Sequence, residues 1–282
     1  MPAPISSLQN QRIKEVVKLN NRRQRDKRRQ TVVEGIREVT RALDSGLVPA
    51  EAYLCPALMA GEEAERAAAQ LTGLASQGRT ELFEVTTAVF QKIAYRGESG
   101  GMLLVFPYLA HSLETVPLGQ PPFLLVLEGV EKPGNLGAIL RTADAAGVNG
   151  LIVCGEAGMA GTDIHNPNVV RASLGALFTV PVVEEENGRL LTWLRQHQIQ
   201  IIAATPQAQQ PYSAADMTGP IAIVMGSEAR GLSTLWLKAA DQQVVIPMQG
   251  HIDSLNLSVA TALLLYEGVR QRRIPQRITN KS

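Results

Sequence analysis

The second half of this 282-residue sequence alternates short, unbroken apolar runs with helical stretches, and this pattern constrains the fold most. The apolar runs are Phe123–Leu127, Gly150–Cys154, Leu177–Val183, Ile199–Ala203, Ile221–Met225 and Val244–Met248. Between and after them, helical spacing predicts helices over 137–146, 168–174, 189–198 and 256–270. Strands that are apolar on both faces are typical of a parallel sheet covered by helices on both sides. We therefore predict an α/β domain with a parallel sheet over residues 123–275.

The first third of the chain predicts a second, smaller α/β unit over residues 1–107. Its expected strands are 31–35, 50–55, 81–85 and 102–106, and its expected helices are 36–45, 61–76 and 87–95. A polar, basic helix is predicted over 6–30. Residues 108–122 are rich in proline without clear periodicity, which predicts a linker.

Composition narrows the class of protein further. With 45% hydrophobic and 19% charged residues, the chain can form a core and is not of the disordered type. No run reaches the roughly 18–20 apolar residues of a membrane span, and the charged first 30 residues predict no secretory signal. Cys55 and Cys154 lie far apart in apolar surroundings, so we expect no disulfide framework, no cysteine zinc site and a cytoplasmic protein.

Positive charge gathers at the two ends of the chain, although the net charge is only +1. Eleven of the 27 Lys and Arg residues lie within residues 1–50, most densely over 12–29. A second basic group spans 270–281. Basic ends on a nearly neutral body suggest a polyanionic partner such as nucleic acid. On charge alone, a solvated helix face explains the pattern equally well.

The loops at the carboxyl ends of the strands are where parallel sheets bind ligands. The first loop, residues 128–141, is rich in glycine but fails the tests for a phosphate cradle. Gly137 is followed by Ala138 rather than by Lys-Ser/Thr, and the GxGxxG spacing is absent. Asn135 is expected to cap a helix that starts near Leu136, and Arg141 follows two turns later.

Two further loops carry polar residues after apolar runs. In the second, Gly226 and Gly231 flank a Ser-Glu pair that includes Glu228. In the third, residues 246–260, Ser254 or Asn256 is expected to cap the final helix. His251 and Asp253 suggest acid–base chemistry, but no neighbouring residue completes a triad. Each loop alone is compatible with a purely structural turn.

Taken together, the three loops resemble the SpoU branch of the SPOUT superfamily, the RNA ribose 2′-O-methyltransferases. The similarity lies in Asn135-x-Gly137-x-x-x-Arg141, in Gly226-Ser-Glu228-x-x-Gly231-Leu232, and in Ile246-Pro-Met248 followed by Ser254-Leu-Asn256-x-Ser258-x-Ala260. The stretch from Arg171 to Pro181 also resembles one that the family carries between the first two motifs. Residues 1–107 resemble the family's small substrate-binding domain, which is similar to ribosomal protein L30.

The resemblance implies a trefoil knot in the catalytic domain, S-adenosylmethionine as cofactor, no metal and a homodimer formed through that domain. The cofactor would be held by backbone groups of Thr205, Gly226, Ile246, Met248 and Leu255. Of the catalytic residues that it implies, Arg141 would bind the phosphate beside the target ribose and help the 2′-hydroxyl lose its proton. Asn135, Glu228, Ser254 and Asn256 would complete the network around it.

The resemblance also favours an RNA contact at the N-terminal basic run, through Arg22, Arg23, Arg28 and Arg29. The separate domain resembling a ribosomal protein favours ribosomal RNA over tRNA as substrate. A tRNA ribose methyltransferase and an inactive knotted RNA-binding protein are the alternatives. A nucleotide-dependent oxidoreductase or kinase on a doubly wound sheet is disfavoured by the failed glycine-loop tests.

Overall fold

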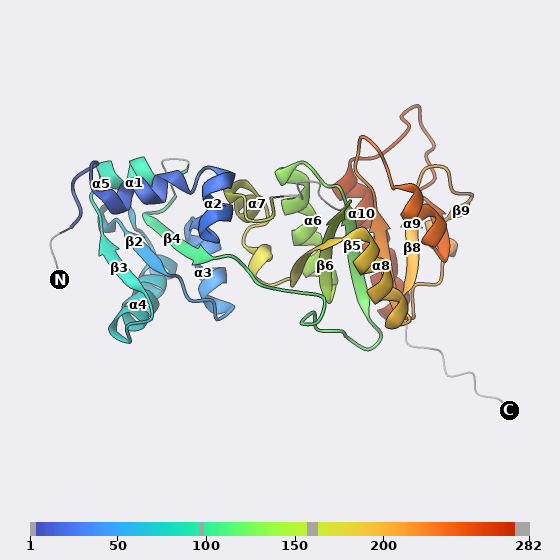
Figure 1. The fold of residues 1–282 in the computed structure, drawn as a ribbon, viewed down its shortest axis with the longest axis horizontal. Coiled ribbons are helices and arrows are strands. Elements are labelled where there is room, and N and C mark those ends of the chain that lie inside the picture. The colour runs from blue at the N-terminus through green and yellow to red at the C-terminus, as the bar shows by residue number, and fades with distance from the viewer. Residues whose placement is uncertain (1–3, 96–98, 157–162, 274–282) are drawn as a thin grey trace. The chain divides into compact units, whose positions relative to one another are not determined.

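The computed structural model describes residues 4–95, 99–156 and 163–273. The chain divides into two compact units (Figure 1). Unit 1 comprises Met1–Leu109 together with Asp163–Thr179, and unit 2 comprises Ala110–Thr162 together with Val180–Ser282. The expected domain end at 275 and the basic residues Arg277 and Lys281 lie outside the described residues.

Unit 1 is built on a mixed four-stranded sheet in the order β1-β4-β2-β3. β4 is antiparallel to β1 and β2, and β2 is parallel to β3. Its strands are β1 (Gln30–Glu34), β2 (Glu51–Leu54), β3 (Glu81–Glu84) and β4 (Met102–Pro107). Its helices are α1 (Gln11–Lys18), α2 (Arg22–Arg28), α3 (Ile36–Asp44), α4 (Glu62–Ser76), α5 (Thr87–Ile93) and α7 (Pro167–Ala172), with short 3₁₀ turns at Pro56–Leu58 and Ala176–Phe178.

The basic segment 6–30 forms two helices rather than the single helix predicted. The Leu19 amide closes α1 on the carbonyl of Val16 at 2.9 Å. Asn21 then starts α2 by accepting a 2.9 Å hydrogen bond from the Arg23 amide. An asparagine side chain satisfies an otherwise unpaired N–H at a helix start, so the break is a capping signal within the basic run.

Residues 163–179 belong to unit 1 although the sequence places them between two strands of the large sheet. Arg25, fully buried, pairs with Asp163, and Thr31 donates a 2.7 Å hydrogen bond to the carbonyl of His165. α7 packs against β1, which is an edge strand of the small sheet. The segment is therefore tied to α2 and β1 by side-chain contacts.

Unit 2 contains a seven-stranded sheet in the order β7-β6-β5-β10-β8-β11-β9, parallel throughout. Its strands are β5 (Phe123–Glu128), β6 (Gly150–Gly155), β7 (Val182–Glu186), β8 (Gln200–Ala204), β9 (Gln210–Pro211), β10 (Ile221–Met225) and β11 (Gln242–Val245). Its helices are α6 (Pro133–Ala146), α8 (Asn187–Gln196), α9 (Thr234–Ala239) and α10 (Leu257–Arg273), with a 3₁₀ turn at Tyr212–Ala214. The predicted parallel α/β architecture is confirmed, whereas the knot stays a prediction.

One predicted strand, Leu177–Val183, is largely wrong. Ala176–Phe178 form a 3₁₀ turn in unit 1, and β7 begins only at Val182. Leu174 and Gly175 adopt positive φ values of 52° and 83°, which turns the chain sharply before this apolar stretch. A Cβ at Gly175 would press against the Arg41 side chain. Glycine is therefore favoured at this position both by the positive φ and by the lack of room for a side chain.

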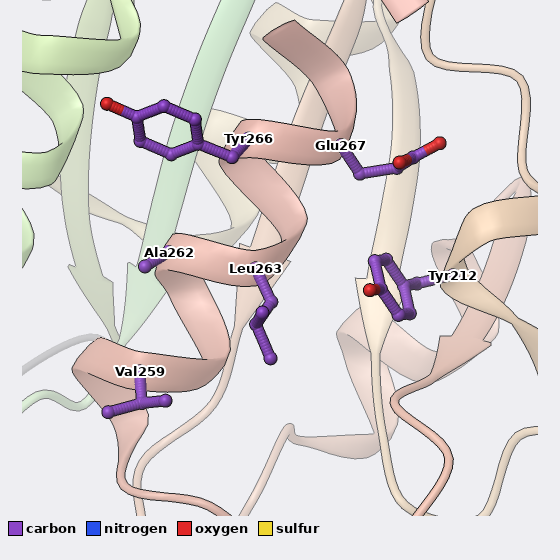
Figure 2. Close-up of a pocket in the computed structure, with 6 residues that line it drawn as sticks. All are labelled: Tyr212, Val259, Ala262, Leu263, Tyr266 and Glu267. Carbon is purple, nitrogen blue, oxygen red and sulfur yellow. The ribbon is translucent and has the colours of Figure 1, made fainter. Parts of the chain in front are cut away.

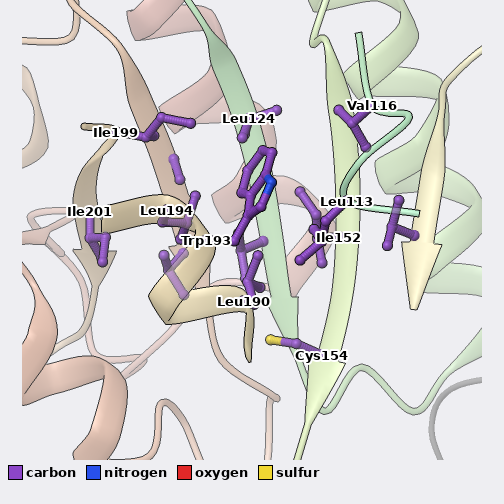
Figure 3. Packing of buried hydrophobic residues seen from close by; sticks show 14 of the residues in the cluster. Leu113, Val116, Leu124, Ile152, Cys154, Leu190, Trp193, Leu194, Ile199 and Ile201 are labelled. Atoms are coloured by element: carbon purple, nitrogen blue, oxygen red, sulfur yellow. The ribbon is translucent and has the colours of Figure 1, made fainter. Parts of the chain in front are cut away.

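Helices on both faces explain why the strands of unit 2 are apolar throughout. On one face, α8 places Leu190 and Trp193 against alternate residues of the sheet, including Leu124 and Ile152 (Figure 3). Trp236 of α9 belongs to the same cluster. On the other face, Gly268 of α10 lets its helix approach the ring of Phe123, which would lie 2.9 Å from an added Cβ. Along β5, the apolar residues that point to either face of the sheet are therefore buried.

The proline-rich stretch 108–122 is anchored along part of its length. Leu113 and Val116 are buried in the core of unit 2, packed with Ile152 and Leu190 (Figure 3). Both cysteines, Cys55 and Cys154, are buried and unpaired. Among the described residues, no helix is long and apolar enough to cross a membrane.

His165 is a buried histidine that stabilises the docking of residues 163–179 only in its neutral form. Its ring stacks on that of Tyr108 with centroids 3.7 Å apart, and its Nε2 accepts a 3.0 Å hydrogen bond from the Leu109 amide. Burial, reinforced by the nearby charges of Arg29 and Arg25, lowers the pKa of His165 from 6.5 to about 3. Protonation would convert the hydrogen-bond acceptor into a donor.

Acidification should therefore destabilise unit 1. Because the folded pKa lies below the unfolded one, the unfolded state takes up the proton first as the pH falls below about 6.5. Stability should be constant above that pH and fall below it by up to about 1.4 kcal/mol per pH unit. Urea unfolding between pH 7.5 and 5 measures this slope. His165→Gln should be less stable at pH 7 but lose less on acidification, and equal slopes for both proteins would contradict the assignment.

Candidate active site at the strand ends

The order of the parallel strands brings the three polar loops together. β10 lies between β5 and β8, and β8 pairs in turn with β11. The loops after β5, β10 and β11 thus start at the same edge of the sheet, as expected for a ligand site in a parallel α/β protein. Far-separated motifs become neighbours because parallel pairing aligns the carboxyl ends of their strands.

Glu228 is the centre of a hydrogen-bond network that joins these loops. Its Oε1 accepts bonds from Asn135 Nδ2 at 2.8 Å and from Asn256 Nδ2 at 3.0 Å, and its Oε2 pairs with Lys132. Asn256 Nδ2 also reaches Asn135 Oδ1 at 3.2 Å. Three predicted site residues, one from each motif, are therefore in direct contact.

The electrostatics of this network keep Glu228 ionised. Hydrogen bonds from Lys132 and then from Asn135 lower the pKa of the Glu228 carboxyl below its usual value. The group is a poor candidate for a general base near neutral pH, because a carboxylate with a lowered pKa holds a proton weakly. Its geometry instead suits an anchor that fixes two asparagine amides.

Asn256 serves two roles, one structural and one in the network. Its Oδ1 accepts hydrogen bonds from the amide of Ser258 at 3.0 Å and from the Ser258 hydroxyl at 2.6 Å, which caps the start of α10. Its amide nitrogen faces Glu228 and Asn135. The predicted cap is confirmed, and the same side chain links the helix start to the site.

Asn135 does not cap a helix as predicted. α6 begins earlier, with Lys132 as the N-cap residue and Pro133 in the first position, where proline is well tolerated. Asn135 therefore lies in the first turn, and its side chain is free to bind Glu228.

Arg141 and Ser254 are not part of the Glu228 network. Arg141 is exposed on α6, about 9 Å further along the axis than Asn135 at 1.5 Å per residue. Ser254 is exposed in the loop before α10. Arg141 forms no ion pair with a described residue.

The turn after β10 requires glycine at position 226. The amide of Gly231 donates to the carbonyl of Ser227 at 2.9 Å, which folds the turn back on itself. An added Cβ at Gly226 would overlap the backbone of Gly231 and Leu232. Gly231 itself has a φ of 65°, which favours glycine.

Glu128, a buried carboxylate at the end of β5, was not predicted from the sequence as a site residue. It accepts 2.7 Å hydrogen bonds from the Asn187 side chain and from the Ser233 amide, and Asn187 in turn accepts one from the Trp236 indole at 3.3 Å. Glu128 thereby ties the end of the β10 turn to β5 and α8. The signal in the sequence that could have pointed to Glu128 is its position as an acidic residue directly after the apolar run Phe123–Leu127.

The five expected cofactor residues all lie near the same sheet edge. Thr205 follows β8 and is buried, with its amide bonded to the carbonyl of Val244 at 2.9 Å. Gly226 follows β10 and Ile246 follows β11. Met248 and Leu255 lie half-buried in the segment between β11 and α10. Their placement at three neighbouring strand ends agrees with a single binding site, which stays a prediction.

Much of the positive charge of the N-terminal run is already neutralised within unit 1. Arg28 pairs with Glu15, and Arg22 lies 3.5 Å from Asp26. Arg29 stacks over the Tyr108 ring at 4.8 Å but forms no ion pair with a described residue. Arg23 is exposed and similarly unpaired in the described chain. Of the four predicted RNA contacts, Arg23 and Arg29 are the two whose charge is available.

Metal ligands do not gather at this site. Among the described residues, no group of three or more His, Cys, Asp or Glu side chains is placed to hold a metal ion.

Fold and site together define a two-unit α/β protein whose polar strand-end loops converge on one edge of a parallel sheet. Residues 122–266 match the SpoU rRNA Methylase family, and residues 10–103 match the MRM3-like substrate binding domain. The chain belongs to the SpoU rRNA methylase family.

Solved structures similar to this chain include an RNA 2′-O ribose methyltransferase and an rRNA methyltransferase from Sinorhizobium meliloti bound to AdoMet. The first has 38% identity, covers 96% of this chain and 99% of its own, and has a TM-score of 0.80. The second has 29% identity, covers 95% and 97%, and has a TM-score of 0.84.

Among curated relatives, the 23S rRNA (guanosine-2′-O-)-methyltransferase RlmB of Shewanella oneidensis is 44% identical over 153 residues. The match covers 54% of this chain and 61% of that protein, so it spans less than two thirds of the relative's length.

The Gly226→Ala substitution should distort the β10 turn. Because the new methyl group overlaps backbone rather than a flexible side chain, we expect a loss of about 1–3 kcal/mol in the free energy of unfolding, measured in urea. Gly188→Ala in α8 is the matched control, since nothing lies within 4 Å of its added methyl group. That variant should stay within about 1 kcal/mol of the parent, and an equally small effect at Gly226 would contradict the steric argument.

Proposed function

We propose that this protein is an S-adenosylmethionine-dependent methyltransferase that modifies a ribose 2′-hydroxyl of ribosomal RNA. The observation that carries the proposal is the network in which Asn135, Glu228 and Asn256 join three family motifs at one sheet edge. Family membership and the similarity to an AdoMet-bound rRNA methyltransferase support it. Residues 123–275 would carry the chemistry and residues 1–107 would bind the substrate.

The strand-end loops suit a cofactor of this kind. The close backbone approach at Gly226 forms a narrow turn that a side chain would fill, and Ile246, Met248 and Leu255 supply apolar surface and peptide groups. Such a lining suits an adenine and a ribose better than a polyphosphate, which agrees with the failed phosphate-loop tests. When bound, the cofactor supplies a methyl group already activated by its sulfonium centre, so no metal is needed for activation.

The protein's contribution is to orient the ribose hydroxyl and stabilise the negative charge that develops on it. Arg141 binds the phosphate beside the target ribose, and its positive charge lowers the free energy of the developing alkoxide. Glu228 holds Asn135 and Asn256 in fixed positions beside the reacting groups. Ser254, exposed in the loop before α10, contributes a hydroxyl to the substrate side.

Arg141→Ala tests this assignment. Methyl transfer from labelled S-adenosylmethionine to 23S rRNA should fall by at least about a hundredfold, because a charge-stabilising group is lost. Calorimetric binding of S-adenosylhomocysteine and the unfolding midpoint should be nearly unchanged, since Arg141 is exposed. Arg141→Lys should not restore activity, because an ammonium group lacks the planar fork of guanidinium.

The matched control is Arg230→Ala, because Arg230 is an exposed arginine of the β10 turn that forms no ion pair with a described residue. It should keep most of the activity. Near-normal turnover of Arg141→Ala on saturating RNA would overturn the role of Arg141, and failure of the parent protein to methylate any ribosomal RNA would overturn the proposed function.

Ribosomal RNA is the proposed substrate because a solved structure that covers 95% of this chain and a curated relative that matches 153 of its residues are both named as rRNA methyltransferases. Arg23 and Arg29 would contact its phosphates, with Arg22 and Arg28 contributing where RNA displaces their carboxylate partners. A ribosomal substrate implies that the protein acts in the cytoplasm.

A homodimer formed through unit 2 is part of the proposal. α10 exposes Val259, Leu263 and Tyr266, which recur at i, i+4 and i+7 on one side of the helix. With Tyr212, Ala262 and Glu267 they line an open, mostly apolar groove (Figure 2). α10 packs against α6, which carries Arg141. A partner seated on this face would bring its own groups close to Arg141, which no described group of unit 2 engages.

Charge placed on this face should separate the subunits. The parent protein should sediment at about twice 30.4 kDa. The double variant Leu263→Asp, Tyr266→Asp should sediment as a monomer, because a buried unpaired carboxylate opposes association. Leu235→Asp on α9 is the control, with a similarly exposed leucine away from this face, and should remain dimeric. A parent that is monomeric throughout the micromolar range would exclude the dimer.

A further inference from the structure

Most of the stretch from Arg171 to Pro181 belongs to unit 1, whose second segment ends at Thr179. We infer that Tyr95 and Arg171 form a second RNA-contacting surface on unit 1, where Tyr95 stacks on an unpaired base and Arg171 binds a neighbouring phosphate. The inference rests on the proposed function, since it takes RNA as the substrate. It concerns a surface distinct from the N-terminal basic run.

Tyr95 is an exposed aromatic ring that is held at both of its ends. Its side chain hydroxyl accepts a 3.0 Å hydrogen bond from Asn168 Nδ2, and its backbone amide donates a 2.7 Å bond to the buried carboxylate of Glu34. The residue is nevertheless 38% exposed. A surface ring fixed in this way loses little freedom on binding, which favours its use as a stacking platform.

Arg171 lies one helical turn after Asn168 on α7, so the two side chains share a face of that helix. Its guanidinium is exposed and forms no ion pair within the described chain. Its neighbours differ in this respect, because Arg41 donates to the carbonyl of Leu174 and Arg25 is buried against Asp163. Arg171 therefore presents an uncompensated positive charge beside the Tyr95–Asn168 pair.

This combination fits single-stranded or looped RNA better than another protein or a duplex. An exposed aromatic face binds a base only when that base is free of its neighbours in a helix, and a guanidinium matches the phosphate that follows it. α7 lies along the edge strand β1, and the same edge begins at Arg29 and Gln30. The surface is therefore positioned to extend the contacts of Arg29 along unit 1.

Four variants of the full chain test the inference. Tyr95→Ala removes the ring, Tyr95→Phe keeps the ring but loses the bond to Asn168, and Arg171→Ala removes the charge. Arg79→Ala is the matched control, because Arg79 is exposed and unpaired among described residues but precedes β3 at the opposite edge of the sheet. Each is assayed for binding to in vitro transcribed 23S rRNA at several salt concentrations, to a fully paired RNA duplex, and to S-adenosylhomocysteine.

Tyr95→Ala should weaken binding to 23S rRNA by at least about tenfold, while Tyr95→Phe stays within about threefold of the parent. Neither change should alter binding to the duplex, which offers no free base. Arg171→Ala should reduce the slope of log K against log salt by about 0.7–0.9. In the methylation assay, Tyr95→Ala and Arg171→Ala should each raise the KM for RNA and leave kcat unchanged. Their affinity for S-adenosylhomocysteine should also equal that of the parent. Arg79→Ala should match the parent in every assay.

If the parent methylates ribosomal RNA while Tyr95→Ala and Arg171→Ala bind it like Arg79→Ala, the second surface is overturned and the proposed function stands. If the parent binds RNA in a Tyr95-dependent manner but methylates none, the proposed function fails and the surface stands. Absence of any RNA binding by the folded parent overturns both. A Tyr95→Ala defect of equal size on the duplex would also overturn the stacking role.

Discussion

The parallel pairing of β10 with β5 and β8 is the constraint on which the rest of unit 2 depends. It places the ends of β5 and β10 side by side, so that Asn135 in the first motif reaches Glu228 in the second. The apolar strands can stand at the centre of the sheet because α8 and α9 cover one face and α10 the other. The site therefore follows from the same parallel strand order that the helices on both faces stabilise.

Two carboxylates near the site have different surroundings and different consequences. Glu228 is exposed, and hydrogen bonds from Lys132 and Asn135 stabilise its charge and lower its pKa. Glu128 is buried, and neutral donors from Asn187 and the Ser233 backbone satisfy its two oxygens. The buried group fixes the turn that carries the exposed group. Neither is arranged as a general base, because the oxygens of both carboxylates are already held by hydrogen bonds.

Unit 1 is completed by a segment that the sequence assigns to the other unit. Asp163, His165 and Asn168 contact Arg25, Tyr108 and Tyr95 in turn, and α7 packs against β1. The arrangement explains why a strongly basic N-terminal run carries less free charge than its composition suggests. Arg25 serves packing and Arg28 is paired, whereas Arg23, Arg29 and Arg171 are exposed and form no ion pair with a described residue.

The sequence by itself determined the parallel sheet, the strand-end location of the motifs and the glycine at position 226. These follow from local rules, because two-sided burial gives apolar strands and a tight turn excludes a side chain. The sequence could not predict that the basic helix is split in two, because both halves share one helical pattern. It also could not predict the 3₁₀ turn at Ala176–Phe178, because an unbroken apolar run there is typical of a buried strand. Only the tertiary structure decided that Glu228 binds Asn135 and Asn256 while Arg141 stands apart, and that residues 163–179 join unit 1. Those outcomes depend on contacts between residues about 30 to 140 positions apart, which no local pattern encodes.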